Sequence, residues 1–153
     1  MDWYTFIVFL AACCAAASTG AMFPPGPWYD DLNQPGFIPP NWLFPIAWSV
    51  LYVVIAYAAS RVANMPGAGV AIGLWATQNA LNAVWTPVYF GLRRMKAALI
   101  VLGALWLAVA GTIWSFWQLD PIAGMILIPY LVWVSFAGLL NFSFMRLNPD
   151  YAT

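Results

Sequence analysis

The residues that could do chemistry in this chain are aromatic side chains and a few amides, because ionisable groups are scarce. The 153 residues include ten Trp, seven Tyr and ten Phe, but five Lys or Arg, five Asp or Glu, and no His. Without His there is no His general base, no His-ligated zinc site and no proximal-His haem site. No paired carboxylates and no phosphate loop occur within an apolar run, so we expect neither a metal site nor side-chain-driven hydrolysis or group transfer.

The most informative spacing lies between residues 75 and 89. Aromatic and amide residues recur there at steps of three and four: Trp75, Gln78, Asn82, Trp85 and Tyr89. They form one stripe on a helix, and because amides in hydrocarbon need partners, the stripe should face the bundle interior or a cavity.

The opposite face of the same helix carries small residues. These are Gly69, Gly73, Thr77 and Ala80. Small residues at this spacing let two helix backbones approach closely. The residues alone leave open whether this face packs within the chain or forms a dimer interface.

The composition indicates the environment in which these stripes lie. Hydrophobic residues make up 64% of the chain and charged residues 7%, whereas a soluble domain has roughly a quarter charged residues. A nucleic-acid-binding protein needs a basic face, and a disordered chain needs low hydrophobicity. The chain is therefore expected to be a helical protein that crosses a membrane several times and has no nucleic-acid partner.

Charged residues divide the chain into uncharged runs, each at least as long as the roughly 20 residues that cross the hydrocarbon. The runs do not alternate as barrel strands would. They predict an all-α membrane bundle in one domain, 1–153, with five helices at about 3–23, 43–62, 70–90, 96–117 and 121–145. The long loop, about 24–42, contains six Pro residues and should form a stiff lid.

The two ends of the predicted bundle differ in charge. The end with the N-terminus holds one Lys or Arg residue, Arg61, and the end with the long loop holds four: Arg93, Arg94, Lys96 and Arg146. The positive-inside rule then places the long loop and the C-terminus on the cytoplasm-like side. The four basic residues either set this topology or meet carboxylates on a ligand.

The same topology predicts where the aromatic and amide residues converge. One group should meet in the half of the bilayer next to the long loop: Trp48, Tyr52, Asn82, Trp85, Trp133, Ala137 and Asn141. The loop itself adds Trp28, Tyr29 and Phe37. Flat aromatic walls, a few amides and a stiff lid are suited to a large, planar, apolar ligand.

Several motifs in order resemble those of the translocator protein family, TspO, also called tryptophan-rich sensory protein or peripheral benzodiazepine receptor. They include Trp28-Tyr29-Asp30-Asp31-Leu32, Pro45-Ile46-Ala47-Trp48, Gln78-Asn79-Ala80-Leu81-Asn82, Trp85-Thr86-Pro87, Phe90-Gly91-Leu92-Arg93-Arg94-Met95 and Pro129-Tyr130-Leu131-Val132-Trp133. The resemblance covers nearly the whole chain and implies five transmembrane helices. For bacterial members it implies a homodimer through the third helix, in a bacterial membrane that could be the outer one.

The resemblance also implies a function and a set of contacts. Members bind tetrapyrroles such as protoporphyrin IX or haem, sterols and benzodiazepine-type drugs, as ligands rather than required cofactors. Matched positions put Trp28, Tyr29, Trp48, Asn82, Trp133 and Ala137 in the ligand pocket. The family's Trp-x-Pro-Pro motif adds ligand contacts at Phe37, Pro39 and Pro40, where Phe37 replaces a wall Trp. Phe142 replaces the Tyr of a sterol motif, and the missing hydroxyl argues against strong sterol binding.

Two functions are therefore weighed from the sequence. The first is a receptor or sensor that binds tetrapyrroles and transports them in some members. The alternative is an enzyme-like, light- and oxygen-dependent degradation of protoporphyrin, for which the resemblance points to Trp28 and Trp133. A protein whose Trp residues only anchor it in the membrane would not need the deep aromatic and amide stripes.

Overall fold

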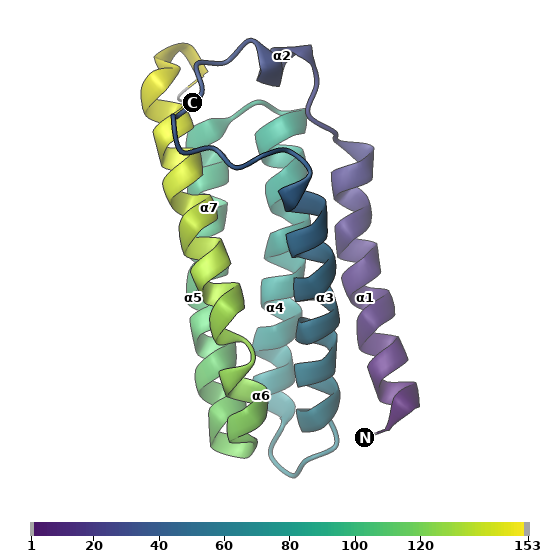
Figure 1. Cartoon of the computed structure of the whole chain (residues 1–153). Helices are drawn as coiled ribbons and strands as arrows, with labels where there is room; N and C mark the ends of the chain where they lie inside the picture. The colour runs from purple at the N-terminus through teal and green to yellow at the C-terminus, as the bar shows by residue number, and fades with distance from the viewer. Residues whose placement is uncertain (1, 152–153) are drawn as a thin grey trace.

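The computed structural model describes residues 2–151, which form a bundle of five long helical segments with no strand among them (Figure 1). Residues 1, 152 and 153 of the predicted domain lie outside this range. The long helices are α1 (Trp3–Met22), α3 (Leu43–Val62), α4 (Gly69–Thr86), α5 (Met95–Leu119) and α7 (Ile128–Leu147). Short helices are α2 (Pro27–Asp30) in the long loop and α6 (Pro121–Met125) before α7.

Four segments are apolar and long enough to cross a membrane by length and composition: α1, α3, α5 and the combined stretch 121–147. The fifth is α4, whose stretch between Gly69 and Asn82 includes Gly, Gln and Asn residues that make it more polar than the others. The fold class predicted from the sequence, an all-α membrane bundle of five helices under a Pro-rich first loop, is confirmed.

Two proline residues change the helices in different ways. Pro87 begins a π-helical turn, Pro87–Gly91, that continues α4 to the end predicted at residue 90. The last helix, expected over residues 121–145, is interrupted at Ile126–Leu127, so α6 and α7 are separate. Pro129 lies in the first turn of α7, where its missing N–H costs no hydrogen bond, so it begins this helix rather than bending a longer one.

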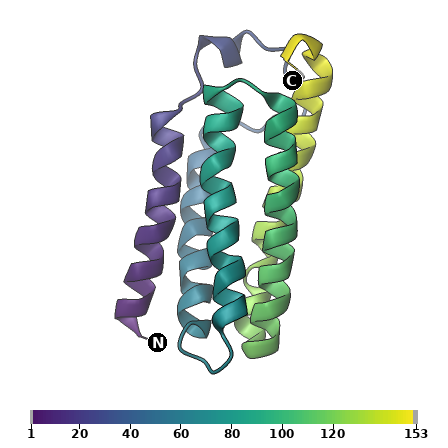
Figure 2. The ribbon, with the colours of Figure 1, turned by 180° about the vertical axis from the view of Figure 1, so that it is seen from behind.

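The helices pack in an order that leaves one side of the bundle open near the loop. α1 contacts α3 and α4, α4 contacts α5, and α5 contacts α6 and α7; Figure 2 shows α4 and α5 side by side. α3 contacts α6 at the end of the bundle away from the loop (Figure 1). A Cβ at Gly124 of α6 would lie 2.9 Å from the backbone nitrogen and Cα of Trp117, so this helix packs directly on the backbone of α5.

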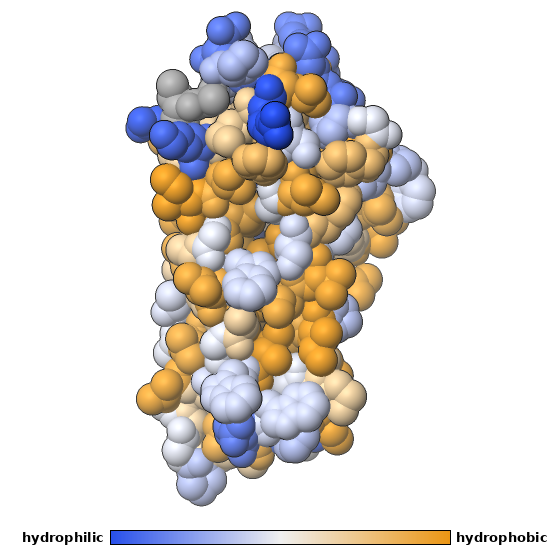
Figure 3. Space-filling view, turned by 90° about the vertical axis from the view of Figure 1, so that its left-hand side faces the viewer, coloured by the Kyte–Doolittle hydropathy of each residue, from blue (hydrophilic) through white to orange (hydrophobic). Residues whose placement is uncertain are grey.

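Charged residues gather at the ends of the bundle. At the N-terminal end, Arg61 Nε lies 2.6 Å from Asp120 Oδ2, the ion pair that joins α3 to the start of α6. Asp120 also caps α6 by accepting from the N–H of Ile122 (3.0 Å). Figure 3 shows the consequence on one face, where hydrophobic residues fill the middle and hydrophilic residues gather at the ends, mainly at the loop end.

Candidate ligand-binding cavity

The lid, residues 24–42, connects α1 to α3 by passing over the end of the bundle toward α7 and back (Figure 1). Within the lid, Tyr29 of α2 is buried, and its ring centroid lies 5.3 Å from that of Phe144 and 5.5 Å from that of Phe90. Burial, with a smaller effect of the neighbouring Asp30 carboxylate, raises the pKa of Tyr29 to about 12. The phenol is therefore neutral at physiological pH, and its ring anchors the lid by packing on Phe144 and Phe90.

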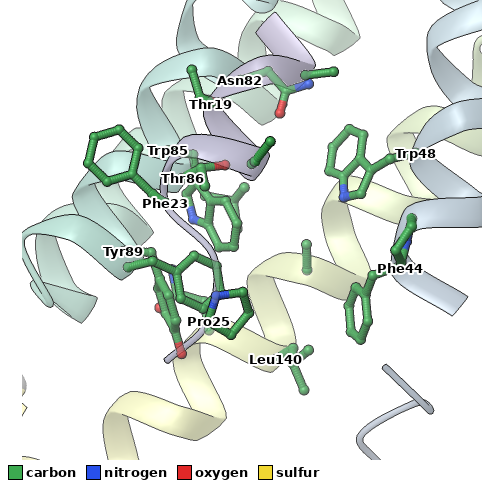
Figure 4. Close-up of a pocket in the computed structure, with 18 of the residues that line it drawn as sticks. Thr19, Phe23, Pro25, Phe44, Trp48, Asn82, Trp85, Thr86, Tyr89 and Leu140 are labelled. Atoms are coloured by element: carbon green, nitrogen blue, oxygen red, sulfur yellow. The ribbon is translucent and has the colours of Figure 1, made fainter. Parts of the chain in front are cut away.

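A cavity of about 770 Å³ lies beneath the lid, bounded by α1, α3, α4 and α7 (Figure 4). This volume is within the roughly 300–1,000 Å³ range of small-molecule and cofactor sites. The cavity occupies the loop-side half of the bundle, where the side chains of the four helices do not fill the space between them. It can therefore hold one large ligand without displacing a helix.

Aromatic rings form most of the cavity wall. Trp48 of α3 and Trp133 of α7 are perpendicular, with ring centroids 6.4 Å apart, and Phe44 lies 5.9 Å from Trp133. On the α4 side, Trp85 stacks on Tyr89 at 5.2 Å. Figure 4 shows Trp48 and Phe44 facing Trp85 and Tyr89 across the open centre.

One hydrogen-bonded polar pair lies among these rings. Asn82 Nδ2 donates to the Oη of Tyr52 at 3.0 Å, and Figure 4 shows the amide oxygen of Asn82 turned toward the open centre. The pair satisfies the donor side of a buried amide and leaves an acceptor for a ligand. This pair can orient a ligand through a hydrogen bond.

The other members of the α4 stripe hold the bundle together. Gln78 Oε1 accepts from the Oη of Tyr130 (2.7 Å), and Trp75 Nε1 donates to the carbonyl of Ile55 (3.2 Å). The expectation that the stripe faces the interior is confirmed, since Trp75, Gln78 and Asn82 are buried. Only the end of the stripe nearest the lid lines the cavity.

Most of the residues predicted to meet there do line this cavity. They are Tyr29, Trp48, Tyr52, Asn82, Trp85, Trp133, Ala137 and Asn141. The amide of Asn141 is oriented so that both of its polar groups have a partner. Its Nδ2 donates to the carbonyl of Met95 (3.1 Å), and its Oδ1 accepts from the N–H of Leu99 (3.2 Å). Its amide thus ties α7 to the first turn of α5.

Four of the predicted contacts lie outside the cavity lining: Trp28, Phe37, Pro39 and Pro40. Trp28 packs within the lid end of the bundle, with its ring 6.2 Å from Tyr89 and 5.4 Å from Tyr151. Phe37 is exposed and packs on Phe136. Trp28 therefore contacts the wall residue Tyr89 from outside the lining, while Phe37 lies on the outer side of α7.

The basic residues at the loop end also lie outside the lining: Arg93, Arg94, Lys96 and Arg146. Arg93 instead lies over the Trp28 ring, 5.6 Å from its centroid. The charged residue that does line the cavity, among residues 2–151, is Asp30 of the lid. The arrangement therefore favours topology over ligand contact as the role of the four basic residues.

Sequence reasoning missed the contribution of α1. Its last turns supply a wall of small residues and one ring, listed from the N-terminal side as Ala16, Ala17, Thr19, Gly20, Ala21 and Phe23. Ala16 and Gly20 are spaced by four, which indicates close packing of helices. In the structure a Cβ at Gly20 meets nothing within 4 Å, so here the small residues leave space.

The small-residue face of α4 is exposed on the outside of the chain. Gly69, Gly73, Thr77 and Ala80 are all exposed, and a Cβ at Gly69 or Gly73 would meet nothing within 4 Å. Within residues 2–151, this face therefore does not pack against another helix, and the dimer interface stays a prediction.

The fold and the cavity define a class: a helical membrane protein with an internal, aromatic-walled cavity. The TspO/MBR family model matches residues 6–147, and the chain belongs to this family. It is 52% identical over 148 residues to a tryptophan-rich sensory protein of Cereibacter sphaeroides, covering 97% of this chain and 94% of the relative. It is 47% identical to the protein CrtK of Rhodobacter capsulatus, covering 97% and 96% of the two chains.

The similarity extends to animals. The translocator protein of Homo sapiens is 34% identical over 154 residues, covering 95% of this chain and 91% of the human one. The family resemblance inferred from the motifs is thereby confirmed, and the chain is a multi-pass membrane protein of this family.

Proposed function

We propose that this protein is a membrane receptor that binds one tetrapyrrole, such as protoporphyrin IX or haem, in the cavity beneath the lid. The observation that carries the proposal is the aromatic-walled space of about 770 Å³ between Trp48, Trp133 and Trp85. Flat rings buried against Trp and Tyr faces gain apolar contact and offset stacking. Other large apolar ligands, such as sterols and benzodiazepine-type drugs, fit the same wall chemistry, and binding serves sensing or transport.

The lining also suggests how a metalloporphyrin would be held. The chain has no His, and among residues 2–151 neither Cys nor Met lines the cavity. Oxygen donors are present as the phenols of Tyr29, Tyr52 and Tyr89 and the carboxylate of Asp30, and an oxygen that bound iron would make haem bind more tightly than protoporphyrin IX. We expect ring packing to provide most of the affinity, so that the two porphyrins bind similarly.

The test is a titration of purified protein in detergent with protoporphyrin IX, followed through the porphyrin Soret band. We expect saturable binding with one site per chain. The variant Trp48→Phe/Trp133→Phe should weaken binding, because it shrinks both walls. Trp114→Phe is the matched control, since Trp114 is 69% exposed on α5; equal affinities of the wall variant and this control would refute the assignment of the cavity.

A second candidate function is light- and oxygen-dependent degradation of the bound porphyrin. It is favoured by the line of redox-active rings that leads away from the cavity: Trp85 stacks on Tyr89 (5.2 Å), and Tyr89 packs on Trp28 (6.2 Å). In this scheme oxygen is the oxidant, the porphyrin is oxidised, and Trp133 and Trp28 are the reacting or relaying side chains. Illumination in air should give a defined product only with protein; bleaching at the same rate without protein would refute it.

We further propose that the protein is a homodimer through the exposed face of α4. The support is the open space above Gly69 and Gly73, which lets a second helix approach the backbone. Gly73→Leu should convert the dimer to a monomer in light scattering of detergent-solubilised protein, while Gly103→Leu on the exposed face of α5 should not. A wild-type protein that is monomeric in lipid nanodiscs would refute this assembly.

The orientation follows from charge. We propose that the lid and the C-terminal end face the cytoplasm, because four of the five basic residues lie at that end. Labelling of single introduced Cys residues in the Cys13→Ala/Cys14→Ala background would test this. A Cys at residue 34 of the lid should be protected from an impermeant reagent outside the cell, and one at Asn64 should react.

A further inference from the structure

The end of α7 is tied to the lid by a reciprocal pair of hydrogen bonds. Asn148, which ends α7, accepts at Oδ1 from the backbone N–H of Asn33 at 2.9 Å. Its Nδ2 donates in return to the backbone carbonyl of Asn33 at 3.0 Å. The two residues are 115 positions apart in the chain, so these bonds join the lid to the bundle rather than shape a local turn.

The same side chain is part of the helix end that supports the cavity wall. Asn148 Nδ2 also donates to the carbonyl of Phe144 at 2.9 Å. Phe144 lines the cavity and packs against Tyr29 of the lid. Asn148 is 7% exposed; its bond to Phe144 is buried and its two bonds to Asn33 are partly buried. One buried amide therefore connects α7, the cavity wall and the lid.

Polar attachment of the lid to the bundle is concentrated here. Among residues 2–151, the side-chain hydrogen bonds that join 24–42 to the rest of the chain all involve Asn33, with Asn148 or Leu147 as the partner. Elsewhere the lid is held by packing, including buried Leu32, the Tyr151 ring 5.4 Å from Trp28, and the Arg93 guanidinium over the Trp28 ring. Apolar packing is not directional, so the hydrogen bonds of Asn148 fix where the lid rests.

The two asparagines contribute unequally. Removing the side chain of Asn148 removes three hydrogen bonds, to the N–H and carbonyl of Asn33 and to the carbonyl of Phe144. Removing the side chain of Asn33 removes only an exposed 3.3 Å bond from Nδ2 to the carbonyl of Leu147. We call the hydrogen bonds between Asn33 and Asn148 the clasp. Comparing the two Ala variants therefore distinguishes loss of the clasp from a general effect of losing an amide side chain.

We infer that Asn148 is the positioning residue that holds the lid closed, and that opening of this clasp sets the rate at which a ligand leaves the cavity. The part about release rests on the proposed function, because it needs a bound ligand. The part about the lid does not, because the backbone N–H of Asn33 is itself a partner of Asn148 and reports on the clasp directly.

The experiment compares Asn148→Ala and Asn33→Ala with the control Asn64→Ala, whose side chain bonds Thr5 at the opposite end of the bundle. Hydrogen exchange of the Asn33 backbone amide is measured by NMR without ligand. Release of protoporphyrin IX into excess acceptor vesicles is measured by stopped flow. For Asn148→Ala both rates should rise about tenfold, the factor given by the net loss of one or two hydrogen bonds.

Asn33→Ala should raise both rates less than about threefold, in line with the loss of one weak, exposed hydrogen bond, and Asn64→Ala should leave them unchanged. Asn148→Asp keeps the acceptor for the Asn33 N–H and loses both donated bonds, so its exchange rate should be intermediate. It also serves as the second variant if Asn148→Ala does not fold.

Unchanged exchange at Asn33 in both folded Asn148 variants would overturn the clasp. Faster exchange with unchanged porphyrin release would overturn the control of release. A wild-type protein that binds no protoporphyrin refutes the proposed function and the release part together, while the exchange rates still support or refute the clasp.

Discussion

A larger side chain at Ala137 of α7 should fill part of the cavity and weaken the binding of protoporphyrin IX. Ala137 lines the cavity one turn from Trp133 and one turn from Asn141. Ala137→Leu adds three carbon atoms that point into space the ligand needs, and not into the packed bundle. A bound ligand must then tilt or push the leucine aside, and overpacking of this kind costs about 1–3 kcal/mol. The dissociation constant for protoporphyrin IX should rise about 5- to 150-fold.

The assay is the Soret titration, run beside a thermal unfolding curve of the ligand-free protein. The unfolding midpoint should stay within a few degrees of wild type or rise slightly, since the leucine buries apolar surface in a cavity. Ala104→Leu is the matched control, because Ala104 is exposed on α5, and its affinity should equal that of wild type. An Ala137→Leu protein that is folded and binds protoporphyrin as tightly as wild type would show that the ligand lies elsewhere.

Three further predictions concern the bundle. Gly124→Ala should lower the free energy of unfolding by about 1–3 kcal/mol, because the added Cβ would lie 2.9 Å from the Trp117 backbone. The thermal midpoint should fall for this variant. It should not fall for the control Gly111→Ala, whose Cβ would lie at an ordinary contact distance of 3.5 Å from the Leu74 side chain. Tyr52→Phe should cost about 1–3 kcal/mol, because Asn82 Nδ2 loses its partner; an unchanged midpoint would contradict this. The Arg61 guanidinium lowers the pKa of Asp120 below its usual 3.8, so the stabilisation is present at neutral pH and is lost as the pH falls through that lowered pKa. Midpoints measured from pH 7 to 3 should therefore fall less for Asp120→Asn than for wild type, and parallel curves would contradict the ion pair.

The sequence predicted most of the bundle because each helix is marked by a long uncharged run and a charged or Pro-rich boundary. The α3 bounds, 43–62, agree with the prediction, since Pro-rich residues precede Leu43 and Arg61 lies at the other end. The break at Ile126–Leu127 was not predicted. Hydropathy is continuous there, and the close packing of Gly124 of α6 on the Trp117 backbone of α5 is a three-dimensional contact that hydropathy does not indicate.

The cavity was predicted from α3, α4 and α7 because aromatic and amide residues on these helices repeat at helical spacing. The wall from α1 was not predicted, since Ala17, Gly20 and Ala21 carry no functional group and contribute space rather than contacts. The clasp was also missed. Asn33 and Asn148 each look like ordinary polar residues at the end of a segment, and only the three-dimensional fold brings them within hydrogen-bonding distance.

The central claim is that one tetrapyrrole occupies the cavity beneath the lid, and a crystal structure of the protein with protoporphyrin IX tests it most directly. The account predicts the macrocycle between Trp48 and Trp133, within reach of the Asn82 amide oxygen, with the lid closed over it and the Asn33–Asn148 hydrogen bonds intact. A macrocycle bound on the outer surface of α4 or against the outside of the lid, with the cavity empty, would contradict it.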